Sequence, residues 1–308
     1  MMSSIIRTLI KQSRDKEKNI YNSHLNYIFY GEVAKSTTAA ALSKFSDEPV
    51  LLISPAGGST YLENDFKNII SYPVSNLNEL RVLIDDLDKN MEAIRRLQLF
   101  IAADNKERIQ SAKEYYEGIG EDWEYIYNLA KNNKFPISAL VVEELSVISS
   151  WIHNEVEEKL DIVSVGNDKK NMGGDWNVLK RDQMDFFTKL LKFPCTTILS
   201  TGSRMPGESQ KDQIIAPNIC VGAAQRQLVD LIGNIFYFYK DDAGNYKVRL
   251  TKDKKVFAKD KLLSPYTNQK LPDEIDITGK PELFWETLSE MKKKDNEHRK
   301  QMEKSGGK

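Results

Sequence analysis

Few residues of this chain could hold a transition metal or form a disulfide. Its 308 residues include two cysteines, Cys195 and Cys220, and three histidines, His24, His153 and His298. The cysteines fall in or near apolar runs without metal-ligand spacing, so we expect reduced core residues and infer no disulfide. The histidines are scattered along the chain, which gives no support to a zinc site or to a histidine-activated nucleophile.

Long apolar runs and an excess of one charge are also missing. No run approaches the roughly 20 apolar residues that cross a bilayer. The start of the chain, where an apolar trio is followed by a charged run, is unlike a signal peptide. We therefore expect a cytoplasmic protein without a membrane partner. The net charge of -1 gives no global attraction to nucleic acid, so any DNA binding would need a local basic patch.

Glycine is missing where a phosphate-binding loop would need it. In residues 26–42, an apolar, aromatic run reaches Gly31, and a Lys-Ser-Thr-Thr sequence beginning at Lys35 then opens an alanine-rich segment with high helix propensity. Strand, short loop, Lys-Ser/Thr and helix is the arrangement of a P-loop. The full pattern has glycine six positions and one position before the lysine, where this chain has Phe29 and Ala34.

Two interpretations of this segment stay open on its own residues. In one, it is an ordinary helix N-terminus, with Ser36 or Thr37 as the capping residue and Lys35 solvated. In the other, it is the remainder of a nucleotide site. The residues of that site would be Gly31, Ala34, Lys35, Ser36, Thr37 and Thr38.

The order of the apolar segments predicts an α/β fold. Short apolar runs at residues 50–54, 69–74, 135–142 and 194–201 indicate buried strands, and segments of helical periodicity separate most of them. We expect an α/β domain with a mostly parallel central sheet. A hairpin of residues 234–239 and 246–250 follows near the C-terminus.

The same patterns divide the chain into segments. Residues 1–25 are predicted to form an N-terminal helical segment, residues 26–271 the main domain, and residues 272–308 a C-terminal helix and charged tail. Within the main domain, residues 76–133 are a helical insertion of two or three helices. We expect the aromatic residues of this insertion to be core residues and not base-stacking groups. They are Tyr115, Tyr116, Trp123, Tyr125 and Tyr127.

Two carboxylates follow one of the buried strands. Glu143 and Glu144 come directly after residues 135–142 and precede a helix predicted from Ser146 to Leu160. An acid at the carboxyl end of a central strand, beside a P-loop, is where Mg²⁺ and its waters are usually held. The other interpretation is that both acids simply begin the next helix, where its dipole favours negative charge.

Four motifs, taken in chain order, resemble those of the phage-encoded RecA-like P-loop ATPases. This family includes the Sak-type single-strand annealing proteins. The four motifs are the loop before Lys35, the strand and Gly-Gly of residues 51–60, the strand and acids of residues 141–146, and residues 175–181 leading into the strand at 194. The resemblance covers about residues 26–271, apart from the helical insertion, and implies that these residues form a RecA-like P-loop NTPase core that binds a nucleotide.

This resemblance implies a site for ATP and Mg²⁺. Lys35 would contact the phosphates, and Ser36 and Glu143 would hold the metal. Glu143 and Glu144 are the candidate catalytic acids.

The resemblance also implies partners. Residues 256–261 are similar to a segment that reaches the neighbouring subunit's nucleotide site in related hexameric helicases, so Lys259 or Lys261 would act in trans in a homo-oligomer. A single-strand binding protein would be a further partner, and a phage-encoded protein would act in the host cell cytoplasm. Single-stranded DNA would be contacted by Lys169, Lys170, Arg204 and Lys211.

Departures from the family pattern bear on catalysis. Members of this family have a glutamate that orients the attacking water, and this chain has Ser54 and Ala56 at the corresponding positions. In addition, a Cβ at Ala34 would crowd the phosphates. Losing several such parts should lower the rate by orders of magnitude. The sequence therefore predicts a protein of DNA recombination, single-strand annealing or replication with weak or lost ATP hydrolysis. The alternative is a catalytically inactive pseudo-ATPase with a structural or protein-interaction role.

Overall fold

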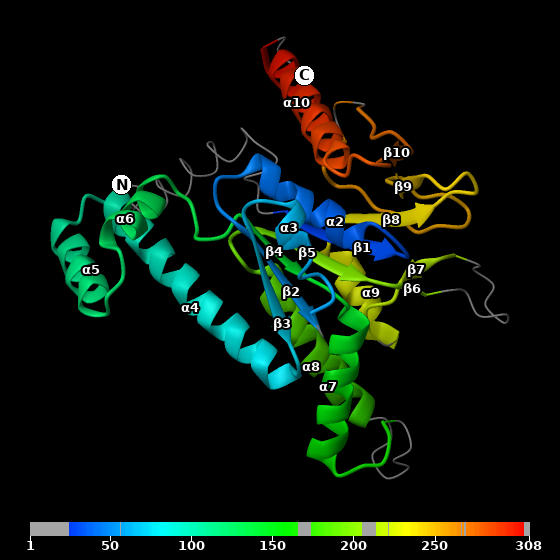
Figure 1. The fold of residues 1–308 in the computed structure, drawn as a ribbon, viewed down its shortest axis with the longest axis horizontal. Helices are drawn as coiled ribbons and strands as arrows, with labels where there is room; N and C mark the ends of the chain where they lie inside the picture. The colour runs from blue at the N-terminus through cyan, green and yellow to red at the C-terminus, as the bar shows by residue number, and fades with distance from the viewer. Residues whose placement is uncertain are drawn as a thin grey trace.

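The computed structural model describes residues 25–55, 57–165, 174–204, 214–220, 222–265, 267 and 269–304. These residues form an eight-stranded sheet of order β10-β9-β8-β1-β5-β4-β2-β3, with helices on both faces (Figure 1). The six strands from β8 to β3 are parallel, and β9 and β10 extend the sheet in antiparallel fashion. The predicted α/β fold with a mostly parallel sheet is confirmed.

The strands have the following bounds: β1 Asn26–Gly31, β2 Val50–Pro55, β3 Ile69–Val74, β4 Ala139–Val142, β5 Thr196–Thr201, β6 Ser203–Arg204, β7 Ala216–Pro217, β8 Asn234–Lys240, β9 Tyr246–Arg249 and β10 Glu274–Asp276. The helices are α2 Lys35–Ala40, the 3-10 helix η3 Ala41–Phe45, α3 Leu62–Asp65, α4 Leu77–Ala102, α5 Lys106–Gly118, α6 Trp123–Lys131, α7 Leu145–Leu160, α8 Gly174–Leu191, α9 Gly222–Leu231 and α10 Leu283–Lys304. Strands β6 and β7 pair separately from the main sheet.

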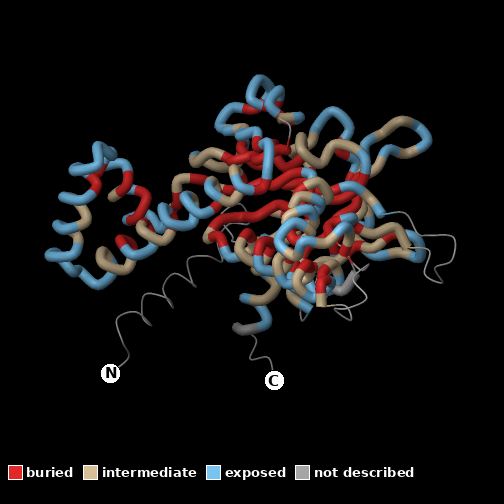
Figure 2. Tube along the Cα trace, turned by 90° about the horizontal axis from the view of Figure 1, so that it is seen from below, coloured by how far each residue is buried: buried red, intermediate tan, exposed pale blue. Residues whose placement is uncertain are grey.

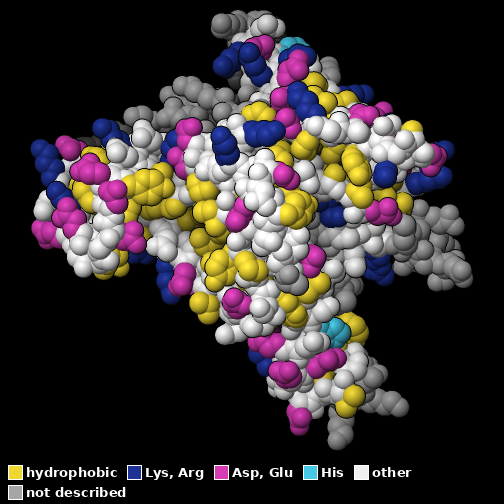
Figure 3. Space-filling view, in the orientation of Figure 1, with side chains coloured by type: hydrophobic (Ala, Val, Ile, Leu, Met, Phe, Trp, Pro, Cys, Tyr) yellow, Lys and Arg dark blue, Asp and Glu magenta, His cyan; other side chains and the backbone are white. Residues whose placement is uncertain are grey.

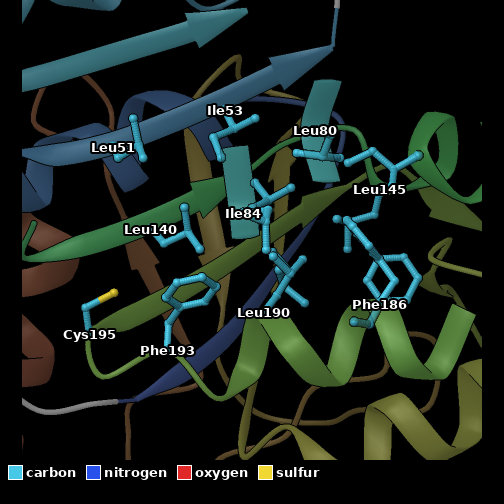
Figure 4. Packing of buried hydrophobic residues seen from close by; sticks show 14 of the residues in the cluster. Leu51, Ile53, Leu80, Ile84, Leu140, Leu145, Phe186, Leu190, Phe193 and Cys195 are labelled. Carbon is cyan, nitrogen blue, oxygen red and sulfur yellow. The ribbon is translucent and has the colours of Figure 1, made fainter. Parts of the chain in front are cut away.

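Side chains point alternately to the two faces of the sheet along each strand, which divides the core into two layers. In β2, for example, Leu51 and Ile53 face one layer, and Val50 and Leu52 face the other, because successive strand residues point to opposite faces. Helices α4, α7, α8 and α9 cover the first face, and α2, α3 and α10 cover the second. Figure 4 shows part of the first layer, and Figure 2 shows the buried strands at the centre of the molecule.

Both cysteines belong to the first layer. Cys195 and Cys220 are buried and free, as predicted. Burial raises the pKa of each thiol to about 12, so neither is a reactive thiolate at neutral pH. Among the described residues, no helix combines the length and the apolarity that crossing a membrane requires.

The helical insertion is confirmed as three helices between β3 and β4. The side chains of Asn76, Asn105 and Asp122 accept hydrogen bonds from backbone N–H groups in the first turns of α4, α5 and α6, which is the usual role of these residue types at helix starts. The first half of α4 packs on the sheet through Leu80 and Ile84. Its second half carries α5 and α6 away from the sheet (Figure 1).

The aromatic residues of the insertion only partly follow the prediction. Tyr116 and Trp123 are buried and Tyr127 packs against the core. Tyr115 and Tyr125 are 62% and 50% exposed, so their assignment to the core is wrong. They lie on the outer side of short helices that have only one face to pack.

The C-terminal helix is anchored in the second layer. Phe284 and Trp285 are almost fully buried, and their rings pack on Tyr27 and Phe29 of β1 with centroids 5.3–5.9 Å apart. The Trp285 indole N–H donates to the carbonyl oxygen of Thr38 at 2.6 Å. The boundary predicted after residue 271 falls between β9 and β10, which pair in one sheet.

Gly31 is required by the neighbouring strand. Its φ is +130°, and a Cβ there would lie 1.9 Å from the carbonyl oxygen of Phe238 in β8. We expect Gly31→Ala to lower the free energy of unfolding by about 3 kcal/mol, since neither backbone can yield without breaking the β1–β8 pairing. Denaturant unfolding measures this. Gly118→Ala is the control, because nothing lies within 4 Å of its added Cβ; equal losses in both variants would contradict the steric argument.

Candidate functional site

The loop between β1 and α2 has only three residues, Glu32–Ala34. Ala34 takes the left-handed conformation, with φ 59° and ψ 3°, directly before the helix. The N–H of Glu32 is held by the Phe238 carbonyl at 3.2 Å. No described residue accepts a hydrogen bond from the N–H groups of residues 33–37. A P-loop turns such groups towards phosphate oxygens.

Lys35 is held over this loop. Its ammonium group donates to the carbonyl oxygen of Gly31 at 2.6 Å, which closes the loop on itself. Partial burial lowers the pKa of Lys35, and the nearby carboxylates of Glu143, Glu32 and Glu144 act in the opposite direction. The interpretation as an ordinary helix start with a solvated lysine is therefore wrong. Neither Ser36 nor Thr37 is the capping residue; Ala34 holds that position, with no side-chain cap.

The carboxylate of Glu143 joins two loops. Glu143 follows β4, is 4% exposed and donates its backbone N–H to the Ile53 carbonyl of β2 at 2.9 Å. The Ser36 hydroxyl donates to Oε1, and the Ser59 hydroxyl donates to Oε2. Because a buried carboxylate is costly without such partners, both hydroxyls stabilise its position between β1 and β2.

Glu144 has a different environment from its neighbour. It precedes α7 in the left-handed conformation, with φ 51° and ψ 50°, and its side chain does not cap the helix. The carboxyl group is exposed. Partial desolvation and the adjacent Glu143 raise its pKa, and Lys35 opposes this. A non-glycine residue in this conformation is strained, and here it separates two adjacent acids, one buried and one exposed.

The described structure thus brings together Gly31, Ala34, Lys35, Ser36, Glu143 and Glu144. Thr37 lies partly exposed in the same helix. Thr38 is fully buried, and its hydroxyl has no partner among the described residues. Sequence reasoning missed Ser59. A small polar residue directly after the Gly-Gly that follows a buried strand was the available signal.

The predicted trans-acting lysines differ from each other. The Lys259 ammonium donates to the carbonyl oxygens of Val229 and Asp230 at 2.9 and 3.2 Å, so it binds the end of α9 in its own chain. Lys261 is exposed. Their action on a neighbouring subunit stays a prediction.

Of the four predicted DNA contacts, Arg204 alone lies within the described residues. Arg204 is exposed on β6, whereas Lys169, Lys170 and Lys211 lie outside the described residues. The ends of α7 and α8 that flank residues 166–173 lie apart from β6 and β7 (Figure 1). On the face shown in Figure 3, cationic and anionic side chains are interspersed.

The donors at Ser36 and Glu143 suit a hard cation. Among the described residues, no group of three or more His, Cys, Asp or Glu side chains could hold a metal. Mg²⁺ in nucleotide sites, however, uses one or two carboxylates together with phosphate oxygens and waters. One buried carboxylate and one hydroxyl beside Lys35 fit that requirement. Ser54, one of the two positions at which the resemblance indicates loss of the water-orienting acid, is buried, and its hydroxyl donates to the Pro55 carbonyl at 3.3 Å. The other position, Ala56, lies outside the described residues.

Comparison with known proteins gives the family of this chain. A family model described as an AAA domain matches residues 27–262. No curated protein matches the chain. The family model covers well over half of the sequence, so the chain belongs to the AAA domain family and contains a P-loop, nucleotide-binding domain.

Ala34 gives a test of the loop conformation. The left-handed conformation costs a non-glycine residue about 1–2 kcal/mol. Glycine avoids this strain, but it loses more conformational entropy on folding, which offsets part of the gain. We expect Ala34→Gly to raise the free energy of unfolding by about 0.5 kcal/mol or more, measured by denaturant unfolding. Ala112→Gly in α5 is the matched control and should lower it by about 1 kcal/mol. A loss of stability in both variants would contradict the assigned conformation.

Proposed function

We propose, because the chain belongs to the AAA domain family, that it binds a nucleoside triphosphate together with Mg²⁺ at the carboxyl ends of β1 and β4 and hydrolyses it slowly. One observation carries the proposal: the Ser36 hydroxyl and the buried Glu143 carboxylate meet beside the Lys35 ammonium. A phosphate–Mg²⁺ group requires a cationic side chain and backbone N–H groups for the phosphates, and hard oxygen donors for the metal. Lys35, the loop before α2, and the Ser36–Glu143 pair offer these groups.

Each residue has a role in this proposal. The Lys35 ammonium leaves the Gly31 carbonyl and binds phosphate oxygens, a step favoured by the low solvation of the amine. Ser36 and Glu143 would hold Mg²⁺, which would offset the negative charge of the phosphates. Glu144, exposed and with a raised pKa, is the candidate base for the attacking water.

The proposed hydrolysis is slow because two parts of the usual site are altered. The three-residue loop ending at Ala34 offers fewer N–H groups than a full P-loop, and Ser54 supplies no carboxylate at the end of β2. Positioning and electrostatic stabilisation account for most of the catalysis of phosphoryl transfer. A complete loss of turnover would favour the inactive pseudo-ATPase, in which the same site binds nucleotide to control protein contacts.

Equilibrium binding of ATP and ADP, with and without Mg²⁺, tests the nucleotide site. We expect Lys35→Ala to weaken ATP binding roughly 10- to 150-fold, the value of a hydrogen bond to a charged group. Lys67→Ala, which removes an exposed lysine outside the site, should bind as the unaltered protein does. Equal affinity of the Lys35→Ala variant would end the assignment of Lys35, and absence of any ATP binding by the unaltered protein would end the proposed function.

A second function is favoured by a group of exposed cations near β6. Strand pairing places Arg204 opposite Ala216, and Ile215 bridges to Val256, so β6 lies near the segment 252–255. Asp253 in that segment is engaged by Arg249 at 2.9 Å and by two backbone N–H groups. The remaining exposed cations form no ion pair with a described residue. We call them the basic edge: Arg204, Lys252, Lys254 and Lys255.

The basic edge is connected to the nucleotide loop. The Tyr30 hydroxyl, one residue before Gly31, donates to the Ile215 carbonyl at 3.2 Å and to the Phe257 carbonyl. A change in the loop therefore has a direct path to the segments that carry Arg204 and Lys255. We propose that the backbone of single-stranded DNA binds here, in keeping with the recombination or annealing role that the Sak-type resemblance implies.

Salt-dependent binding of a labelled single-stranded oligonucleotide tests the basic edge. The double variant Lys254→Ala/Lys255→Ala should bind more weakly and reduce the slope of log affinity against log salt by roughly 1.4, about 0.7 for each lost phosphate contact. The control is Lys67→Ala/Lys131→Ala, which removes the same charge from exposed positions elsewhere. An equal change of slope in both double variants would show only a net-charge effect and would contradict the assignment.

A further inference from the structure

We propose that Ser59 is a positioning residue that sets the affinity of the site for Mg²⁺ by fixing the second oxygen of Glu143. The inference rests on the proposed nucleotide function and deepens it. It starts from one contact: the Ser59 hydroxyl donates to Glu143 Oε2, while the Ser36 hydroxyl donates to Oε1.

Ser59 comes from a loop separate from the P-loop. It follows β2 and the Gly57-Gly58 turn, and it is 5% exposed. The Gly57 N–H donates to the Ser54 carbonyl at 3.3 Å, and Gly57 itself has φ +70°. This turn reverses the chain at the end of β2 and directs Ser59 back towards β4.

The backbone of Ser59 is held on several sides. Its carbonyl accepts from the Leu62 N–H at 3.1 Å and from the Ser71 hydroxyl at 3.5 Å. Leu62 is fully buried in the second core layer. A Cβ at Gly57 would meet the Pro73 side chain at 3.3 Å, so β3 also limits the turn. The hydroxyl thus projects from a fixed point.

A fixed donor matters because the acid is glutamate. Glutamate has one more rotatable bond than aspartate, so placing its carboxylate loses more side-chain entropy. Mg²⁺ requires near-ideal octahedral geometry, so its ligand oxygens must be held in defined positions. If Ser36 and Glu143 hold the cation, the Ser59 hydroxyl would orient the carboxylate through its hydrogen bond to Oε2 without itself being a ligand. Partners of this kind typically change metal affinity 10- to 100-fold.

A purely structural role would have a different signature. Loss of the Ser59 hydroxyl leaves Oε2 without its donor and lowers stability in either case. Mg²⁺ increases nucleotide binding up to a maximum, and the Mg²⁺ concentration that gives half of this increase is the half-saturating concentration. Only the positioning role changes it. That concentration, measured on folded full-length protein, is the deciding quantity.

The experiment titrates Mg²⁺ against binding of a fluorescent, non-hydrolysable ATP analogue. Ser59→Ala should raise the half-saturating Mg²⁺ concentration roughly 10- to 100-fold and leave affinity without Mg²⁺ unchanged. Ser59→Thr keeps the hydroxyl and should restore most of the loss. Ser54→Ala is the matched control: Ser54 is a buried serine at the end of β2 whose hydroxyl donates to the Pro55 carbonyl.

The outcomes separate the two proposals. A Ser59→Ala protein with the Mg²⁺ dependence of the unaltered protein, or with equal loss of binding at all Mg²⁺ concentrations, overturns the role of Ser59 alone. A shift of the same size in Ser54→Ala does so as well. If the unaltered protein binds no nucleotide with or without Mg²⁺, the nucleotide site itself is overturned, and Ser59 with it.

Discussion

A single buried carboxylate connects three strands that the chain forms far apart in sequence. Glu143 follows β4, and β4 is separated from β1 by β5 in the sheet. Its two oxygens nevertheless accept from Ser36, after β1, and from Ser59, after β2. Because an isolated buried carboxylate costs several kcal/mol, the two loops and the strand end are stable only together. The position of the loop before α2 therefore depends on the carboxyl ends of β2 and β4 as well as on β1.

The shortened loop is explained by two competing requirements. Gly31 lies where β1 meets β8, and its close contact with the Phe238 carbonyl excludes any side chain. Its role is thus in sheet packing and in accepting the Lys35 hydrogen bond. Ala34 instead occupies the left-handed position before the helix, where glycine would be unstrained. The loop therefore keeps its left-handed turn at a cost in backbone strain, in keeping with the slow hydrolysis proposed above.

The sequence predicted most of the fold because its signals are local. Apolar runs gave the parallel strands, and Asn76, Asn105 and Asp122 start the insertion helices as capping rules require. The placement of Lys35, Ser36 and Glu143 followed from the order of strands, since carboxyl ends of parallel strands meet at one edge.

What the sequence did not predict depends on contacts between distant segments. Ser59 is a small polar residue in a turn, and nothing nearby in sequence shows that its hydroxyl meets an acid 84 residues later. Lys259 resembles a surface cation until the end of α9 is placed against it. Tyr115 and Tyr125 have the composition of core residues, but two short helices cannot bury all of their faces. Helical period alone does not decide which face is covered.

The C-terminal helix shows how such a distant contact can reach the site. Helix α2 has only six residues before the chain continues as the 3-10 helix η3. In a 3-10 helix, each carbonyl accepts from the N–H three residues later, and in an α-helix from the N–H four residues later. The carbonyl of Thr38, two residues after Ser36, accepts from the Trp285 indole N–H. Trp285 and Phe284 are also fixed by the rings of β1. β1 and α2, which flank the loop of residues 32–34, therefore both contact α10, so the C-terminal helix stabilises both ends of that loop.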